Sequence, residues 1–241
     1  MAAAADLHFA LDEIAARLQA ESGIHVHAIY GSSGNFYQQI LNGAPFDVFL
    51  SANVDYPKKL EAAGLARPGT YFEYARGKIV VAVPANSTLD IQQGLKVLTD
   101  PAIKKVAIAD PGHAPYGVAA VAALKAEHIY GQVSTKLVTG ESISQAASFV
   151  LSGAADAGII ALSLLKAPAA GAQVRFDEIP ASDYPPILQA GVVLRSSKQQ
   201  KATEKFEAFL RSKEAASIFR HYGFEVPEAT ERFLPEVLRS E

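Results

Sequence analysis

The stretch Tyr30-Gly-Ser-Ser-Gly-Asn35 joins an apolar, strand-like segment, 25–30, to a helix. The helical spacing begins at once, with Phe36, Ile40 and Leu41 on one face. A loop of this kind directs backbone N–H groups, hydroxyls and the positive end of a helix dipole to one point. Proteins bind oxyanions at such junctions without a lysine or an arginine. By itself, however, the stretch is also typical of a flexible turn or a plain helix N-cap.

Three further helices are predicted to begin after small or polar loops of the same type. They begin at Asp6, at Pro115-Tyr116-Gly117 and at Thr139-Gly-Glu-Ser-Ile143. In doubly wound sheets such loops lie at the carboxyl edges of strands, where ligands bind. Two loops from each of two lobes would line a cleft with helix N-termini. Each loop alone is more often a plain cap, and spacing does not show that the four converge.

Apolar β-rich runs alternate with helical patterns along the chain, which predicts an α/β fold with largely parallel sheets. The predicted strands span 46–50, 78–83, 105–109, 157–161 and 187–194. The predicted helices span 7–18, 116–128, 142–151 and 201–222, with Asp6 in the N-cap position of the first.

Two extended runs beside prolines, 80–84 and 184–193, predict that the chain crosses twice between lobes. Lobe I would then be discontinuous, made of residues 1–81 and 191–241. Lobe II would be the inserted part, 82–190, with hinges near 80–84 and 184–193. The pattern alone leaves open the alternative of a single continuous α/β domain.

Composition excludes several classes of function. The chain has 241 residues, 49% of them hydrophobic, which is enough for one large or two small domains. A net charge of −3 provides no basic excess to follow a phosphate backbone, so nucleic-acid binding is not expected. The absence of cysteine excludes thiol catalysis, disulfides and cysteine-based zinc sites.

The sequence gives no sign of a membrane-spanning or targeting segment. No run of about 18 apolar residues occurs, so no transmembrane helix is expected. The first six residues lack the basic and apolar regions of a signal peptide. The protein is therefore expected to be either cytosolic or a mature form that carries a new initiator methionine.

Candidate catalytic residues are few. The six histidines show no metal-binding spacing, and no nucleotide loop or nucleophile elbow occurs. His113 lies in a candidate ligand loop, but Asp6 and Asp110 are more typical of cap and turn residues than of an acid–base pair. A small hydrolase that uses Ser33 would need a histidine partner, and none is identifiable. The catalytic alternatives are therefore poor.

Motifs along nearly the whole chain together resemble one family, the molybdate-binding proteins of ABC-type molybdate transporters. No single motif is specific, but together they follow the family's order. The matching segments are Ala3-Ala-Ala-Asp6, Gly31-Ser-Ser-Gly34, Gln38-Gln-Ile40, Gly43-Ala-Pro-Phe-Asp-Val-Phe-Leu-Ser-Ala52, Ala107-Ile-Ala-Asp110, Pro111-Gly-His-Ala-Pro-Tyr-Gly117, Asp156-Ala-Gly-Ile-Ile160, Tyr184-Pro185 and Tyr222-Gly-Phe224.

The resemblance implies the two-lobed, type II periplasmic binding protein fold, with a mostly parallel sheet flanked by helices in each lobe. It implies that a molybdate or tungstate dianion binds in the cleft between lobes through neutral donors. By position, these donors would come from Ala5, Asp6, Ser33, Tyr116 and the backbone N–H of Ile143. It further implies a binding protein rather than an enzyme, with no cofactor and no directly bound metal cation. The protein would be a periplasmic monomer that closes by a hinge and delivers the oxyanion to an ABC transporter permease.

Three positions depart from the family's pattern. Many members carry a serine at the position of Asp6, where a carboxylate would repel a dianion. We expect Asp6 to cap its own helix and to offer only its backbone N–H. Some members carry a ligand-binding tyrosine at the position of Ala161, whereas others have one that matches Tyr116, so Tyr116 is predicted to be the phenolic donor. Almost nothing precedes Ala3-Ala-Ala-Asp6, so the first strand is expected to be truncated.

One alternative of a different class shares this fold, the ligand-sensing effector domain of a transcription regulator that binds a small anion. The chain shows no DNA-binding helix-turn-helix and carries near-neutral charge. Both observations count against that alternative.

Overall fold

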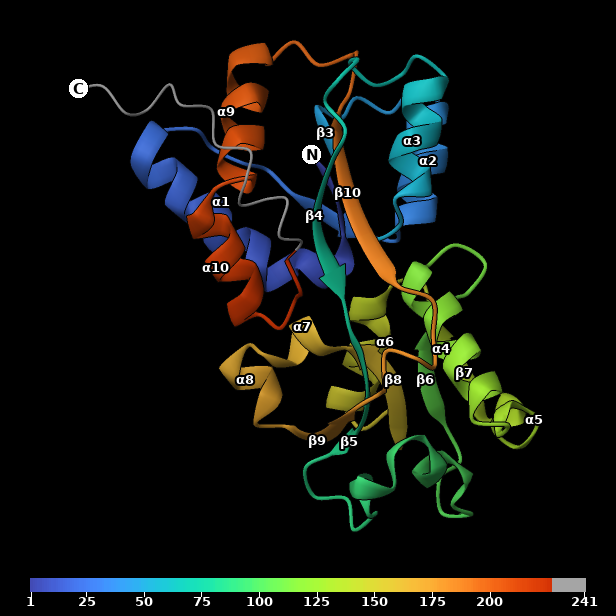
Figure 1. Cartoon of the computed structure of the whole chain (residues 1–241). Coiled ribbons are helices and arrows are strands. Elements are labelled where there is room, and N and C mark those ends of the chain that lie inside the picture. Colours follow the sequence, from blue (N-terminus) through green and yellow to red (C-terminus); the bar gives the residue numbers. More distant parts are fainter. Residues whose placement is uncertain (227–241) are drawn as a thin grey trace.

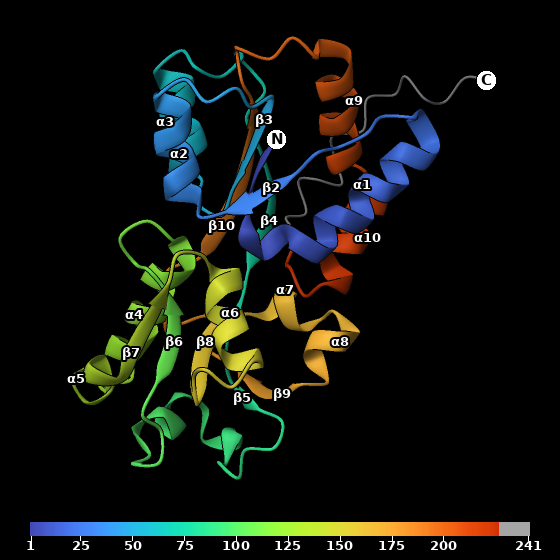
Figure 2. The ribbon, with the colours of Figure 1, turned by 180° about the vertical axis from the view of Figure 1, so that it is seen from behind.

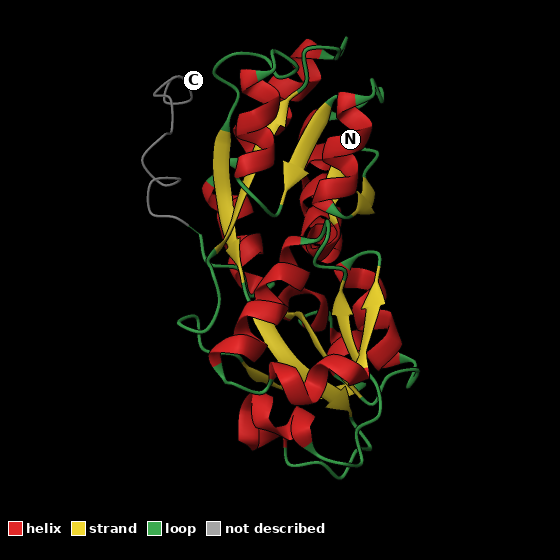
Figure 3. Ribbon diagram, turned by 90° about the vertical axis from the view of Figure 1, so that its right-hand side faces the viewer, coloured by secondary structure: helices red, strands yellow, loops and turns green. Residues whose placement is uncertain are grey.

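The computed structural model describes residues 1–226, which form two lobes, one above the other (Figure 1, Figure 3). Each lobe holds one five-stranded sheet with helices packed against it. The two-lobed α/β fold implied by the family resemblance is confirmed. The last part of predicted lobe I, 227–241, lies outside the described residues.

The sheet of the first lobe has the strand order β2-β1-β3-β10-β4. β1 pairs in parallel with β2 and β3, whereas β10 is antiparallel to β3 and β4. The short first strand is present and lies inside the sheet, where three alanines leave room for close packing of the layers above and below. The strands are β1 (Ala2–Ala4), β2 (Ile29–Gly31), β3 (Val48–Ser51), β4 (Phe72–Gly77) and β10 (Ile187–Val193).

Helices cover both faces of this sheet (Figure 1, Figure 2). α2 (Ser33–Leu41) and α3 (Asp55–Ala62) lie on one side. The other side carries α1 (His8–Ser22), which follows a 3₁₀ turn, η1 (Ala5–Leu7), together with α9 (Gln200–Leu210) and α10 (Lys213–His221). The helix predicted over 201–222 is therefore two helices. The first ends at Leu210, and Ser212 caps the second, because its hydroxyl accepts from the Ala215 N–H at 3.1 Å.

The sheet of the second lobe has the order β7-β6-β8-β5-β9. β6 is parallel to β7 and β8, and β5 is antiparallel to β8 and β9. Each sheet therefore has two parallel and two antiparallel pairings, so the sheets are mixed and the prediction of mostly parallel sheets is wrong. The reason is that β5 and β10, the strands that follow the two crossings between lobes, each run antiparallel to both of their neighbours. The elements are β5 (Ile79–Pro84), η2 (Ile91–Thr99), β6 (Val106–Ala109), α4 (Pro115–Ala126), α5 (Tyr130–Val133), η3 (Ser134–Lys136), β7 (Leu137–Gly140), α6 (Ile143–Leu151), β8 (Ala157–Ala161), α7 (Leu162–Leu165), α8 (Pro168–Gly171) and β9 (Val174–Glu178).

The chain passes between the two sheets twice, through Lys78 and through 179–186. The predicted boundary between 81 and 82 falls inside β5, and the one between 190 and 191 falls inside β10. The physical reason is that each apolar run is a buried strand of one sheet, so the crossings lie in the residues beside it. The two crossings contact each other, because the Ile79 N–H donates to the Tyr184 hydroxyl at 3.4 Å.

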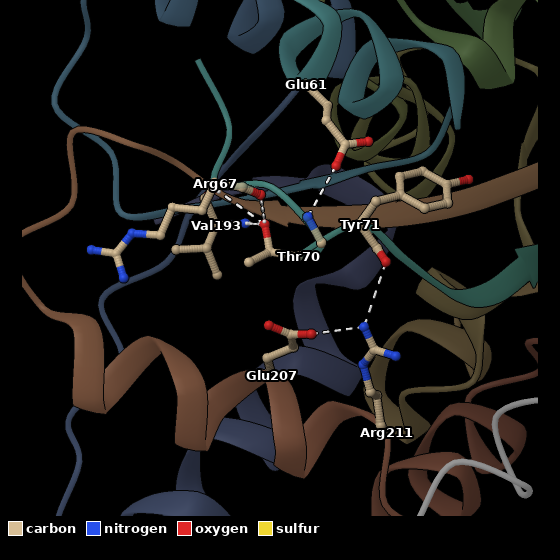
Figure 4. Close-up of polar contacts among 8 residues, drawn as sticks. Glu61, Arg67, Thr70, Tyr71, Val193, Glu207 and Arg211 are labelled. Carbon is tan, nitrogen blue, oxygen red and sulfur yellow. Dashed lines mark hydrogen bonds and ion pairs between the residues drawn. The ribbon is translucent and has the colours of Figure 1, made fainter. Parts of the chain in front are cut away.

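Polar contacts fix the turn that leads from α3 into β4 (Figure 4). The Gly69 N–H donates to the Glu61 carboxylate at 3.3 Å. The Thr70 hydroxyl donates to the Arg67 carbonyl at 2.7 Å and accepts from the Val193 N–H at 3.2 Å. The turn is therefore attached both to α3 and to the end of β10.

Arg211 ties α9 to the start of β4 (Figure 4). Its guanidinium donates to Glu207 at 2.7 Å and to the Tyr71 carbonyl at 3.5 Å, and lies 4.9 Å from the centre of the Phe72 ring. Burial raises the pKa of Glu207, and Arg211 opposes that rise.

We expect Arg211→Gln to lower the free energy of unfolding by about 1–3 kcal/mol, because it leaves a partly buried carboxylate without its cation. Urea unfolding measures the loss, and Glu207→Gln in the same chain should recover part of it; additive losses would contradict the coupling.

Candidate functional site

The starts of four helices meet at one pocket between the lobes. η1 and α2 come from the first lobe, and α4 and α6 come from the second. The first N–H groups of a helix have no partner within the helix, and the dipole makes this end positive. The residues that line the pocket are Ala4, Ala5, Asp6, Gly31, Ser32, Ser33, Ala52, Ala114, Pro115, Tyr116 and Ile143.

All five residues predicted for an oxyanion site, Ala5, Asp6, Ser33, Tyr116 and Ile143, line this pocket. Each is at most 3% exposed. The structure therefore brings together residues that lie up to 138 positions apart in the chain, from Ala5 to Ile143. Their role as ligands stays a prediction.

Ser33 occupies the first position of α2, and its hydroxyl is held in place. The Ser33 Oγ accepts from the Ala52 N–H at 2.9 Å, which leaves the hydroxyl hydrogen available as a donor. In the second lobe, Ser142 caps α6, because its hydroxyl accepts from the Gln145 N–H at 3.3 Å. This cap leaves Ile143 as the first residue of the helix, at the pocket.

The expectation that Asp6 caps its own helix is wrong. Asp6 lies inside the 3₁₀ turn rather than before a helix, and its side chain makes no cap bond there. Its Oδ2 instead accepts from the Tyr116 hydroxyl at 2.8 Å and from the Gln189 Nε2 at 2.5 Å. The carboxylate therefore connects η1 to α4 of the other lobe and to β10.

Gln189 was not predicted as part of the site. It is completely buried on β10 and also donates to the Tyr116 hydroxyl at 3.3 Å. Its side-chain oxygen accepts from the Tyr74 hydroxyl at 3.0 Å. A sequence signal did exist, because a lone glutamine in the apolar run 187–193 must find polar partners once it is buried.

The Tyr116 hydroxyl has a partner other than the one predicted. A hydroxyl has one hydrogen, and here it is donated to Asp6. Burial and the neighbouring Asp6 carboxylate raise the pKa of Tyr116 well above its usual value, so the phenol stays neutral. Donation from Tyr116 to a bound oxyanion stays a prediction, and it would require this hydrogen to leave Asp6.

The carboxyl of Asp6 is in an unusual electrostatic setting. Burial raises its pKa from 3.8 to about 6, although the hydrogen bonds from Gln189 and Tyr116 oppose the rise. Its second oxygen, Oδ1, is buried and has no hydrogen-bond partner. Among the residues that line the pocket, Asp6 alone carries a carboxylate, and none of them carries a cation.

Hydrogen bonds join the lobes on both sides of the pocket. The His113 carbonyl accepts from the Ser32 hydroxyl at 2.6 Å and from the Gly34 N–H at 2.9 Å. The Ser144 hydroxyl donates to the Ala5 carbonyl at 2.9 Å, and Ser163 donates to the Asp6 carbonyl at 2.8 Å. The lobes therefore touch across the cleft in this structure.

The other candidate residues lie beside the pocket rather than in it. The His113 ring is 2.9 Å from the Ser32 Oγ and 3.6 Å from the Asp110 carboxylate. The Asp110 side chain accepts from the Gly112 N–H within its own loop, so Asp6 and Asp110 do not form a carboxylate pair. Within residues 1–226 no group of three or more histidines and carboxylates is placed to hold a metal ion.

The pocket is small. Its lining surrounds about 200 Å³ of space that protein atoms leave free, part of it open to solvent. The ring of helix N-termini and the lack of a cation fit a small inorganic anion. In the part of the chain that the structure describes, no helix is long and apolar enough to cross a membrane.

Comparison with known proteins agrees with this geometry. The model of the family described as bacterial extracellular solute-binding protein matches residues 1–225. The chain belongs to this family. It is a family of solute-binding proteins rather than enzymes, and this membership gives no support to the alternative of a regulator's effector domain.

Relatives in this family include proteins named for molybdate. The molybdate-binding protein ModA of Rhodobacter capsulatus is 40% identical over 212 residues, which cover 88% of this chain and 82% of that protein. ModA of Azotobacter vinelandii is 36% identical over 224 residues, covering 93% and 88%. The solved structure of the Azotobacter vinelandii periplasmic molybdate-binding protein superposes with a TM-score of 0.89 at 34% identity, covering 94% of this chain and 98% of that one.

Proposed function

We propose that this protein captures molybdate or tungstate between its lobes in the periplasm and delivers it to the permease of an ABC transporter. The observation that carries the proposal is the convergence of four helix N-termini, two from each lobe, on one buried pocket without a cation. The similarity of the chain to proteins named for molybdate binding supports the same ligand. The protein would act as a monomer, without a cofactor, and its closed form would be the one that the permease recognises.

The donors of the pocket suit a tetrahedral dianion. The predicted donors are backbone N–H groups at the helix starts and the Ser33 hydroxyl, and a hydrogen bond to a charged group contributes about 1.5–3 kcal/mol. Several such bonds, together with the helix dipoles, replace the water around the anion. Because the donors come from both lobes, tight binding requires the cleft to close.

Calorimetric titration with molybdate, tungstate, sulfate and phosphate tests the proposal. We expect tight binding of molybdate and tungstate and weak or no binding of the two smaller anions, since cavity size distinguishes tetrahedral anions with the same donor needs. A protein that bound none of the four, or that preferred sulfate, would contradict the proposal.

The Ser33→Ala variant is expected to weaken molybdate binding about ten- to hundredfold. The change removes a hydroxyl donor worth about 1.5–3 kcal/mol to a charged ligand, and it also removes the acceptor for the Ala52 N–H. Ser152→Ala is a matched control, because Ser152 is exposed and its hydroxyl bonds only within its own helix end, at 3.4 Å to the Phe149 carbonyl. Equal dissociation constants for the two variants would remove Ser33 from the site.

A further inference from the structure

On the basis of the proposed function, we propose that Asp6 is protonated when the oxyanion is bound and that its Oδ1–H donates to an oxygen of the anion. Capture of the dianion would then take up one proton from solution. Asp6 would be a ligand that makes the affinity for the anion depend on pH. The family resemblance implies a neutral serine hydroxyl at this position in many members.

The hydrogen bonds of Asp6 leave one place for this proton. Oδ2 already accepts two bonds, from Tyr116 at 2.8 Å and from Gln189 at 2.5 Å. Oδ1 is buried and accepts none. A buried polar atom without a partner is costly unless a ligand or water satisfies it. Because Asp6 lines the pocket, a bound oxyanion is the natural partner for a hydrogen on Oδ1.

Repulsion between the Asp6 carboxylate and a bound dianion also favours a proton on Oδ1. An ionised carboxylate and a dianion in contact repel strongly where water is excluded. No residue that lines the pocket offers a cation to offset that repulsion. One proton on Oδ1 removes the carboxylate charge and converts the repulsion into a hydrogen bond.

The groups around Asp6 do not compete for this proton. Tyr116 of α4 and Tyr74 of β4 have pKa values well above the usual range because both are buried, so both remain neutral. From β10 and α7, the Asp6 side chain and backbone meet only the amide of Gln189 and the hydroxyl of Ser163.

The remaining titratable groups near this turn pair elsewhere. On α1, His8 lies 3.5 Å from Asp12 and both are exposed. Before α4, the His113 ring lies between the Ser32 hydroxyl and Asp110. α2 and α6 bring serines and apolar residues to the pocket. Burial already raises the pKa of Asp6 to about 6, and a nearby anion raises it further.

The test is calorimetry with molybdate from about pH 6 to about pH 9, in buffers of different ionisation enthalpy. We expect proton uptake to approach one per molybdate at the alkaline end, where the dissociation constant rises about tenfold per pH unit. Asp6→Asn presents an N–H₂ donor that does not titrate, so its dissociation constant should stay nearly flat and fall below that of the parent at high pH. Tyr116→Phe removes one donor to Oδ2 and should move the onset of the affinity loss to higher pH.

Glu21→Gln is the control, because it makes the same change in charge at an exposed position and should keep the parent's pH profile. Tight molybdate binding by the parent with no proton uptake and no pH dependence would overturn the role of Asp6 and leave oxyanion capture standing. Failure of both the parent and Asp6→Asn to bind molybdate at any pH would overturn oxyanion capture as well. The parent's proton uptake needs no variant, so the proposal stays testable if Asp6→Asn does not fold.

Discussion

Gly34→Ala is expected to weaken molybdate binding about a hundredfold or more while leaving each lobe folded. A β-carbon at position 34 would lie 2.5 Å from the His113 carbonyl oxygen and 3.0 Å from the His113 Cα. These are backbone atoms of the opposite lobe, which a rotamer change cannot move away. The lobes would stay apart, and the anion would lose the two donors predicted in the second lobe, Tyr116 and the Ile143 N–H. This loss lowers the binding free energy by about 3–6 kcal/mol.

The variant separates closure from folding. Gly34 lies in the first turn of α2, where alanine favours a helix more than glycine does, so the thermal unfolding of the first lobe should not suffer. Small-angle scattering with and without molybdate would show whether the lobes still close. Gly131→Ala is the matched control, because a β-carbon there meets nothing within 4 Å. Parent-like affinity in Gly34→Ala would mean that the ligand-bound lobes do not approach at this point.

Local chemistry explains how much of the site could be predicted. Ser33, Tyr116 and Ile143 lie at helix starts after short loops. A few neighbouring residues in the sequence are enough to predict such a helix start. That the four helix starts face one another depends on strand order in two separate sheets, which no local pattern contains. The resemblance to a family supplied that step, and the structure agrees with it.

The hydrogen-bond partners of the Asp6 side chain could not be predicted from the sequence. The capping role expected for Asp6 assumed that its partners are its neighbours in the chain, whereas its actual partners, Tyr116 and Gln189, are more than 100 positions away. Burial determines the partners of Asp6, because a carboxylate that loses its contact with water needs hydrogen-bond donors, and the fold supplies them from distant parts of the chain.

The strands that sequence reasoning missed have a common cause. β4, β7 and β9 were not predicted, and all three lie at the edges of their sheets. β4 and β9 carry charged residues such as Glu73, Arg76 and Asp177, which interrupt the apolar pattern that marks a central strand. Pairing with β10 and β5 holds them in the sheets, so tertiary contacts override weak local preference.

In the absence of ligand, Asp6→Asn is expected to stabilise the protein by about 3 kcal/mol near pH 7. The pKa of Asp6 rises from 3.8 to about 6 on folding, chiefly because of burial, and each pKa unit is worth about 1.4 kcal/mol. The folded state therefore holds this proton more tightly than the unfolded state does. Ionising Asp6 costs stability, which declines as the pH rises from about 4 to about 6 and then levels off.

Asparagine reproduces the neutral form of Asp6, because its amide oxygen can accept from Tyr116 and Gln189 while its charge stays zero at every pH. Urea unfolding of ligand-free parent and Asp6→Asn should therefore agree near pH 4 and diverge above it, reaching about 3 kcal/mol by pH 7. Glu21→Gln, at an exposed position, should follow the parent throughout. Parallel stability curves for the parent and Asp6→Asn across this range would show that the Asp6 carboxyl titrates at its ordinary pKa. Any proton uptake on binding would then be due to the charge of the dianion alone, and its onset would lie at lower pH.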